Sequence, residues 1–407
     1  MPFNVAYFIA QKTSQTENGT FSSTATKVAS ISVAIGIAIL IISFAILGGF
    51  QKTIKNKAYS LSGHVVVSRF SLNNSVELPP IPGENEFIKN YKSYDGIDHL
   101  QKFALKGGIL KTEEEVQGIV LKGVDDNYDW NRFKVNMIAG EAPDYSGEED
   151  SKEVVISKRL LDLMKLSLND TVMVFFIQDP VRFRKLIIKG VYETGLEDFD
   201  DKVVLGDLAL VQNLNNWTAG QIGGYEIFLN DLENIDQIQA TINDNTPAGQ
   251  YADKTSDKYR QIFDWMGLID MNVWILLVIT LFVAGVNMIA PSLLLMMERT
   301  QMIGMLKALG ARQRLIIRIF TIRLLKIVVK GLVIGNLIAL GLCYLQYEFK
   351  LIPLDPVNYY MSYVPIDWNW KAFILVNLLT FVLIGIIILL PAYIISRVKP
   401  VNAIRFD

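Results

Sequence analysis

Side chains that could do chemistry are few in this chain of 407 residues. It has two histidines, His64 and His99, and one cysteine, Cys343, which lies inside an apolar run. Zinc sites and nucleophilic sites need several such side chains within reach of one another, and the spacing here favours neither. The sequence also lacks a glycine-rich phosphate-binding loop. We therefore predict a non-enzymatic chain with no catalytic site, metal site or bound cofactor. Any ATP and Mg²⁺ that it depends on would be bound by another chain.

The sequence contains four long apolar runs. Hydrophobic residues make up 51% of the chain, and the mean hydropathy is +0.30. A helix that crosses roughly 30 Å of hydrocarbon needs about 20 apolar residues. The first run begins too far from the N-terminus, and is too long, for a cleaved signal peptide. The third includes Lys326 and Lys330, whose side chains can reach the interface. We predict four transmembrane helices, at residues 28–51, 271–297, 321–347 and 372–396.

Basic residues predict the orientation of the chain. Segment 298–330 contains eight lysines and arginines and one acidic residue, and such basic segments stay in the cytoplasm. By contrast, residues 52–270 contain 24 basic and 35 acidic residues. We predict a multi-pass membrane protein with both termini in the cytoplasm. Its cytoplasmic parts would be an amphipathic segment at 1–27, a short helix and connector at 298–320 and a tail at 397–407, and the parts outside the cytoplasm would be a domain at 52–270 and a loop at 348–371.

The exported segment, 52–270, is predicted to be a mixed α+β domain. Apolar residues alternate in runs such as 116–123 and 185–192, which is typical of strands, and follow helical spacing in runs such as 207–214. A proline-containing turn at 141–144 favours an inserted subdomain at 125–220. Helical spacing over 254–270 predicts a helix that continues into the second span, so that motion of the domain and of the span would be linked.

The sequence VFFIQDPVRFR at 174–184 predicts a hairpin with a short tip. A hairpin buried in the core of the domain would account for its apolar residues. The alternative is an exposed tip that docks a partner protein. The candidate docking residues are Phe176, Pro180, Arg182, Phe183 and Arg184.

The segment ERTQMIGMLKALGAR at 298–312 follows the second span directly. Its spacing predicts a short amphipathic helix on the membrane surface, with an apolar stripe, a small-residue notch at Gly304 and a left-handed cap at Gly310. This helix could be a simple interfacial linker or a knob that fits a groove on a partner. The residues assigned to the knob are Glu298, Arg299, Met302, Ile303, Gly304, Leu306, Lys307, Leu309 and Gly310.

This segment resembles the signature of the FtsX/MacB-like ABC transporter permeases, in which it is the coupling helix that docks on the ATPase. The order of one span, a large external domain and three further spans is also that of the family. The resemblance implies a MacB-like, type VII ABC permease architecture. Within the superfamily the chain is similar to the lipoprotein-releasing permeases of the Lol type. This similarity lies in GFQ at 49–51 with SGHV at 62–65, in NYYMSYVPI at 358–366 and in SRVKPVNAIR at 396–405.

The resemblance implies a permease subunit that extracts lipoproteins from the outer leaflet of the inner membrane for delivery to the outer membrane. Its implied partners are two copies of an ABC ATPase, a second permease that is homologous or identical, the lipoprotein and membrane lipids, but no nucleic acid. By resemblance and position, the residues that would line the lipid cavity are Phe44, Leu47, Phe50, Met271 and Trp274. These residues could equally pack against one another.

One departure from the family concerns the hairpin. The family's permease that recruits a periplasmic lipoprotein chaperone has a long hook hairpin, whereas the corresponding segment here, 175–185, is short. This difference leaves open whether a periplasmic lipoprotein chaperone is a partner of this chain: the chain could be the partner-type subunit, or its substrate could differ. Two other functions of the superfamily stay open as alternatives: MacB-like efflux, and FtsX-like signalling that regulates a cell-wall hydrolase. The size of the external domain disfavours the signalling function.

Overall fold

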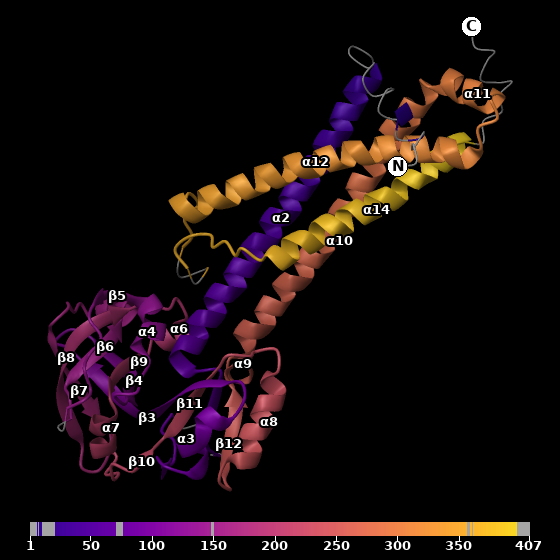
Figure 1. The fold of residues 1–407 in the computed structure, drawn as a ribbon. Coiled ribbons are helices and arrows are strands. Elements are labelled where there is room, and N and C mark those ends of the chain that lie inside the picture. Colours follow the sequence, from indigo (N-terminus) through magenta and orange to yellow (C-terminus); the bar gives the residue numbers. More distant parts are fainter. Residues whose placement is uncertain are drawn as a thin grey trace. The chain divides into compact units, whose positions relative to one another are not determined.

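The computed structural model describes residues 6, 8, 9, 21–70, 76–147, 150–355, 359 and 361–396 (Figure 1). The predicted C-terminal tail, and most of the predicted N-terminal segment, lie outside these residues. The chain divides into two compact units. A helical unit comprises Met1–Gln51, Trp265–Pro353 and Tyr363–Asp407, and an α+β unit comprises Lys52–Asp264 with Leu354–Ser362.

The helical unit contains four helices that are long and apolar enough to cross a membrane, as the sequence predicts. They are longer than the predicted spans, because polar residues extend them at their ends. A short helix, α11 (Thr300–Ala308), lies between the second and third of them. The four long helices are α2 (Phe21–Ser62), α10 (Arg260–Met297), α12 (Gln313–Phe349) and α14 (Trp370–Ser396).

Small residues bring these helices close together. A side chain on Gly331 would collide with Ser30 and Val33 of α2, and one on Gly335 would overlap Ile37. Two glycines four residues apart allow this close approach of helices in lipid. In addition, the amides of Asn336 in α12 and Asn377 in α14 donate hydrogen bonds to each other, at 2.7 and 3.0 Å.

The α+β unit contains a ten-stranded sheet in the order β12-β1-β11-β3-β4-β9-β6-β8-β5, with β7 pairing to β3 and β8 (Figure 1). Six of these strands, β3, β4, β9, β6, β8 and β7, therefore form a closed ring. The strands are β1 (Val65–Arg69), β3 (Ile97–Lys111), β4 (Val116–Val124), β5 (Met137–Gly140), β6 (Glu153–Ser157), β7 (Thr171–Phe176), β8 (Arg182–Tyr192), β9 (Val203–Asp207), β11 (Gly224–Leu229) and β12 (Gln250–Lys254). A separate pair consists of β2 (Ile81–Pro82) and β10 (Gln221–Ile222).

Strand β3 is long enough to belong to both the open sheet and the ring. Its 15 residues pair with β11 in the first half and with β7 at the far end, while β4 pairs along the opposite edge. Segment 125–220, predicted as an inserted subdomain, supplies β5 to β9. The short helices are α3 (Glu86–Asn90), α4 (Trp130–Phe133), α5 (Lys158–Leu163), α6 (Glu197–Asp200), α7 (Leu208–Leu214), α8 (Ile235–Asn245) and α9 (Thr255–Lys258).

The helix predicted to run without a break from residue 254 into the second span is interrupted. The short helix α9 ends at Lys258, and α10 begins at Arg260. Between them Tyr259 has φ −107° and ψ 41°, outside the helical region. From Arg260 onward the helix is continuous, as predicted.

Candidate coupling sites

The C-terminal end of α2 is part of the core of the α+β unit. Residues 58–62 are all buried. Ala58 and Leu61 belong to a cluster that includes Phe133, Tyr192 and Phe199. A helix on a protein surface buries only one stripe, whereas this last segment is enclosed on every side. We call residues 58–64, together with the side chains that hold them, the helix joint.

A buried ion pair lies directly under the end of α2. The amine of Lys122 is 2.6 Å from a carboxylate oxygen of Glu226, and both side chains are almost fully buried. The same amine donates a hydrogen bond to the carbonyl oxygen of Leu61, and Gln101 donates to the other oxygen of Glu226 at 2.8 Å. One of the carbonyls that a helix C-terminus leaves without an intrahelical partner is thus satisfied.

Further hydrogen bonds fix the residues on both sides of this carbonyl. Asn136 Nδ2 donates to Ser60 Oγ at 2.7 Å, and Thr255 Oγ1 donates to the carbonyl oxygen of Gly63 at 2.7 Å. Gly63 has φ +63°, a left-handed conformation that suits glycine and ends the helix. These partners lie far apart in the sequence, so the helix joint forms only in the folded domain.

His64 completes the joint as a neutral side chain. The backbone N–H of Leu229 donates to its Nδ1 at 2.8 Å, and its ring lies 4.4 Å from that of Tyr59. Burial, together with the nearby positive charge of Arg132, lowers the pKa of His64 to about 4. The imidazole is therefore an uncharged hydrogen-bond acceptor at neutral pH.

The start of α10 is attached to the same core. The Tyr259 ring packs against Phe199, with ring centroids 4.9 Å apart, and Phe263 packs against Tyr59 at 5.7 Å. The C-terminal end of α2 and the N-terminal end of α10 thus pack into one cluster. Displacing either helix end would require the whole cluster to move or to break.

At the other end of α10, α11 has the cap that the sequence predicts. Gly310 has φ +85°. Its N–H donates to the carbonyl of Lys307, and the N–H of Ala311 donates to the carbonyl of Leu306, which is the Schellman arrangement. This cap turns the chain sharply before α12.

The predicted apolar stripe of α11 faces inward rather than toward a partner. Ile303 is buried against α10 and α12, Met302 and Leu306 are half-buried, and Gly304 is buried. The small-residue notch predicted at Gly304 is therefore covered by the chain itself. Arg299 and Lys307 are half-buried and make contacts within the chain, and Glu298 is exposed.

The exposed face of α11 consists of different residues. Leu309 is 85% exposed, against the prediction that it joins the stripe, and Met305 is 59% exposed. Both lie on one face with Gln301 and Ala308, which are also exposed. The spacing of four residues from Gln301 to Met305 to Leu309 could have identified this face from the sequence. We call these four residues the outer face of α11.

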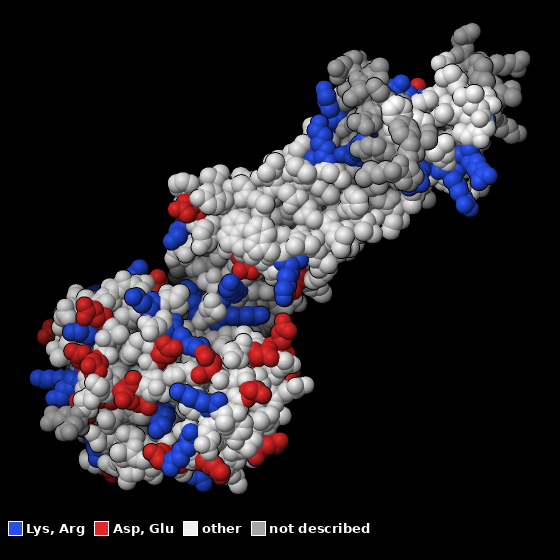
Figure 2. Space-filling model, in the orientation of Figure 1, with Lys and Arg blue, Asp and Glu red and all other residues white. Residues whose placement is uncertain are grey.

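Charge is distributed unevenly over the helical unit. In the view of Figure 2 its middle carries almost no charged side chains, and Lys and Arg gather at the end that contains α11. Arg312, Arg314 and Arg318 are exposed there. This is the pattern of a bilayer-embedded protein with a basic side next to the membrane.

The residues predicted to line a lipid cavity partly pack against one another. Phe44 meets Trp274 edge to face, with ring centroids 6.1 Å apart, and Leu47 is buried. Phe50 packs instead against Trp265, at 5.6 Å, a residue that sequence reasoning missed. A further member of the predicted set, Met271, is exposed on α10.

Two of the five predicted docking residues of the hairpin are not available to a partner. Phe176 is completely buried in the ring. Arg182 donates to the carbonyl of Asn213 at 2.9 Å and to Asn216 Oδ1 at 2.7 Å, so its guanidinium is used inside the unit. Pro180 and Phe183 are exposed and Arg184 is half-buried. Ile177 and Val181, which were not predicted, are also exposed at the tip.

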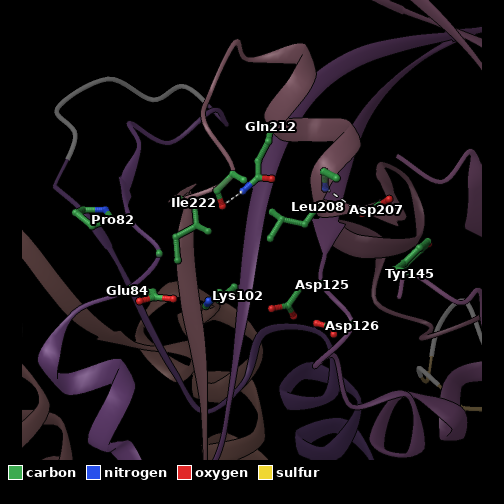
Figure 3. A pocket seen from close by; sticks show the side chains of 14 residues that line it. Pro82, Glu84, Lys102, Asp125, Asp126, Tyr145, Asp207, Leu208, Gln212 and Ile222 are labelled. Atoms are coloured by element: carbon green, nitrogen blue, oxygen red, sulfur yellow. Dashed lines mark hydrogen bonds between the residues drawn. The ribbon is translucent and has the colours of Figure 1, made fainter. Parts of the chain in front are cut away.

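A cavity of about 500 Å³ in the α+β unit is lined by carboxylates, among them Glu84, Asp125, Asp126 and Asp207 (Figure 3). Burial raises the pKa of Asp125 to about 6. Lys102 also lines the cavity. Throughout the part of the chain that the structure describes, no group of His, Cys, Asp and Glu has a geometry that could hold a metal ion.

Two protein families match this chain. The FtsX-like permease C-terminal family matches residues 274–400, and the MacB-like periplasmic core domain matches residues 27–245, more than half of the chain. The α+β unit is thus a periplasmic domain of the MacB type, and the second to fourth spans carry the FtsX-like match.

Relatives match over the full length. The lipoprotein-releasing system transmembrane protein LolC of Xylella fastidiosa is 21% identical over 432 residues, which cover 100% of this chain and 99% of that protein. LolE of Haemophilus influenzae is 20% identical over 396 residues, which cover 93% of each chain. The crystal structure of the periplasmic region of MacB from Actinobacillus actinomycetemcomitans covers 49% of this chain and 92% of its own, at 12% identity and a TM-score of 0.35. The chain belongs to the ABC transporter permeases that combine a MacB-like periplasmic core domain with an FtsX-like permease domain.

Proposed function

We propose that this chain is the permease subunit of an ABC transporter that extracts lipoproteins from the outer leaflet of the bacterial inner membrane. The observation that carries the proposal is the end-to-end similarity to proteins named as lipoprotein-releasing permeases. That similarity includes the α+β domain as well as the spans. Both termini and α11 would lie in the cytoplasm, in keeping with the basic residues around α11.

The outer face of α11 would dock in a groove of a partner ATPase. Met305 and Leu309 are large apolar side chains outside the bilayer-spanning helices, and apolar anchors of this kind contribute most of the binding energy at interfaces. Two ATPase copies would bind ATP and Mg²⁺, and a second permease, identical or homologous, would complete the complex.

ATP-driven motion would reach the periplasm through α10. This helix ends next to α11 and begins in the helix joint, and its 38 residues form one continuous helix. Because the joint also holds the end of α2, the periplasmic domain would move with both helices. The outer ends of α2 and α10, near Phe44 and Trp274, would meet the acyl chains of the lipoprotein.

Reconstitution tests this proposal. The chain is purified with its partner ATPase and second permease, placed in liposomes with a fluorescent triacylated lipoprotein, and given ATP together with a soluble lipoprotein acceptor. We expect transfer of the lipoprotein to the acceptor that requires ATP. ATP hydrolysis without transfer would contradict the proposal, and export of a small toxic compound or activation of a cell-wall hydrolase by the same complex would identify one of the two alternatives.

A further inference from the structure

A second cavity of the α+β unit lies beside the helix joint. Its volume is about 340 Å³, which is at the lower end of the roughly 300–1,000 Å³ typical of ligand sites. Leu61 of α2, Val66 of β1, and Phe103 and Leu105 of β3 give it an apolar wall. Tyr259, just before α10, also lines it. The cavity is therefore lined by strands of the sheet, by the C-terminal end of α2 and by the residue that precedes α10.

The inner end of this cavity is electrically balanced. Lys122 and Glu226 line it, and they form the buried ion pair under α2. Glu226 accepts a further hydrogen bond from Gln101. A ligand group that reached this end would meet no uncompensated charge, so an apolar chain fits there better than an ion does.

The mouth of the cavity carries an excess of positive charge. Lys202 and Lys258 line it and are exposed residues, although burial of the amine lowers the pKa of Lys258, and Asp198 is a carboxylate that also lines the cavity. Among the residues that the structure describes, neither lysine has a carboxylate within 4.0 Å. Two ammonium groups at an opening attract a carboxylate or a phosphate.

We propose that this cavity binds an anionic lipid, with one acyl chain along the apolar wall and its carboxylate or phosphate between Lys202 and Lys258. Leu61 of the cavity wall belongs to α2 and Tyr259 directly precedes α10, and both helices are long and apolar enough to cross a membrane. This inference goes beyond the proposed function, because it does not depend on which cargo the permease moves. A chain bound against Leu61 and Tyr259 would stabilise the helix joint.

Photocrosslinking of the full-length protein in detergent tests the site. The probes are palmitate and lysophosphatidylglycerol that carry a diazirine in the chain, and an uncharged monoacylglycerol with the same chain. We expect the anionic probes to label peptides from β3 and β9, and the uncharged probe to label them at least tenfold less. Labelling by palmitate alone would point to a carboxylate, and labelling by both anionic probes would point to a general anion site.

Charge and volume variants provide the controls. K202Q/K258Q should lower the labelling at least tenfold without changing the thermal unfolding midpoint, because both residues are exposed. K111Q/K134Q removes two other exposed lysines of the same domain and should leave labelling unchanged. Leu105→Trp should lower labelling by filling the cavity. Equal labelling by the uncharged probe, or full labelling of K202Q/K258Q, would overturn the proposal.

Discussion

The two ends of α10 are fixed in different ways. At Arg260 the helix begins in a core where hydrogen bonds, an ion pair and aromatic rings come from the chain itself. At Met297 it leads to α11, whose outer face is bare. Exposed apolar residues of this kind are typical of interaction surfaces. The joint at Arg260 is therefore complete within the chain, whereas the outer face of α11 is left open, as docking of the proposed ATPase would require.

The largest effect on stability should follow from breaking the ion pair of the joint. Lys122→Met leaves Glu226 buried without its cation, which costs about 3–5 kcal/mol. Amide hydrogen exchange of β4 and β11 in the full-length protein would measure this loss. The double variant K122M/E226M removes both charges and should recover most of it. If K122M exchanged as slowly as the wild type, the joint would not depend on this pair.

Acid should loosen the joint through His64. Its pKa is about 4 in the folded protein and 6.5 when exposed, so the unfolded state binds the proton more tightly. Its contribution is fully present above pH 6.5 and is lost as the pH falls from 6.5 to 4, by about 3 kcal/mol.

A variant of His64 that cannot titrate separates the pH dependence caused by His64 from the pH dependence caused by Asp125. The raised pKa of Asp125 has the opposite sign, because its contribution is present at low pH and is lost as the pH rises through about 6. His64→Asn keeps a hydrogen-bond acceptor for Leu229 but cannot titrate. The difference in stability between the wild type and this variant should shrink steadily from pH 6.5 to pH 4. A difference independent of pH would show that His64 is not buried as a neutral group.

A smaller loss is expected from Ser60→Ala, which removes the acceptor for the buried amide of Asn136. An unsatisfied buried polar group costs about 1–3 kcal/mol. Thermal unfolding of the full-length protein would report the change. Ser93→Ala is the matched control, because the hydroxyls of Ser60 and Ser93 both donate to a backbone carbonyl three residues earlier, but Ser93 is exposed. An equal shift of the thermal unfolding midpoint in both variants would contradict a stabilising role of Ser60 in the helix joint.

Sequence reasoning predicted the parts of the molecule that depend on local patterns. The four spans follow from run length, and the cap at Gly310 follows from one glycine after an amphipathic run. The helix joint could not be predicted, because Leu61, Lys122, Asn136 and Thr255 meet only in the folded domain. The residues of α11 that face outward could not be predicted from its apolar stripe either, since such a stripe does not reveal whether the chain or a partner covers it. Both Ile303 and Leu309 fit the pattern, yet only Ile303 is buried.

The smallest effect on stability, with a large effect on coupling, is expected on the outer face of α11. Met305→Asp with Leu309→Asp changes two exposed side chains, so stability should stay within about 0.5 kcal/mol. Stimulation of the partner ATPase should fall at least tenfold, measured as phosphate release by the reconstituted complex. Ile138→Asp, at an exposed apolar residue of β5, is the control. Gly304→Trp is a poor test, because Gly304 is buried and the variant would disturb α11 itself. Normal stimulation by the double variant would refute docking at this face.

A rigid helix joint keeps α2 at a fixed distance from the rest of the α+β unit, and this distance can be measured. Spin labels are placed at Asn56 on α2 and at Lys134 in the α+β unit, both exposed, in a chain whose only cysteine, Cys343, is replaced. The distance between the labels is measured by pulsed electron paramagnetic resonance in the complete transporter, without nucleotide and with ATP trapped by vanadate. We expect one narrow distance distribution that is the same in both states. A distribution that broadens or shifts when ATP is trapped would contradict a rigid helix joint.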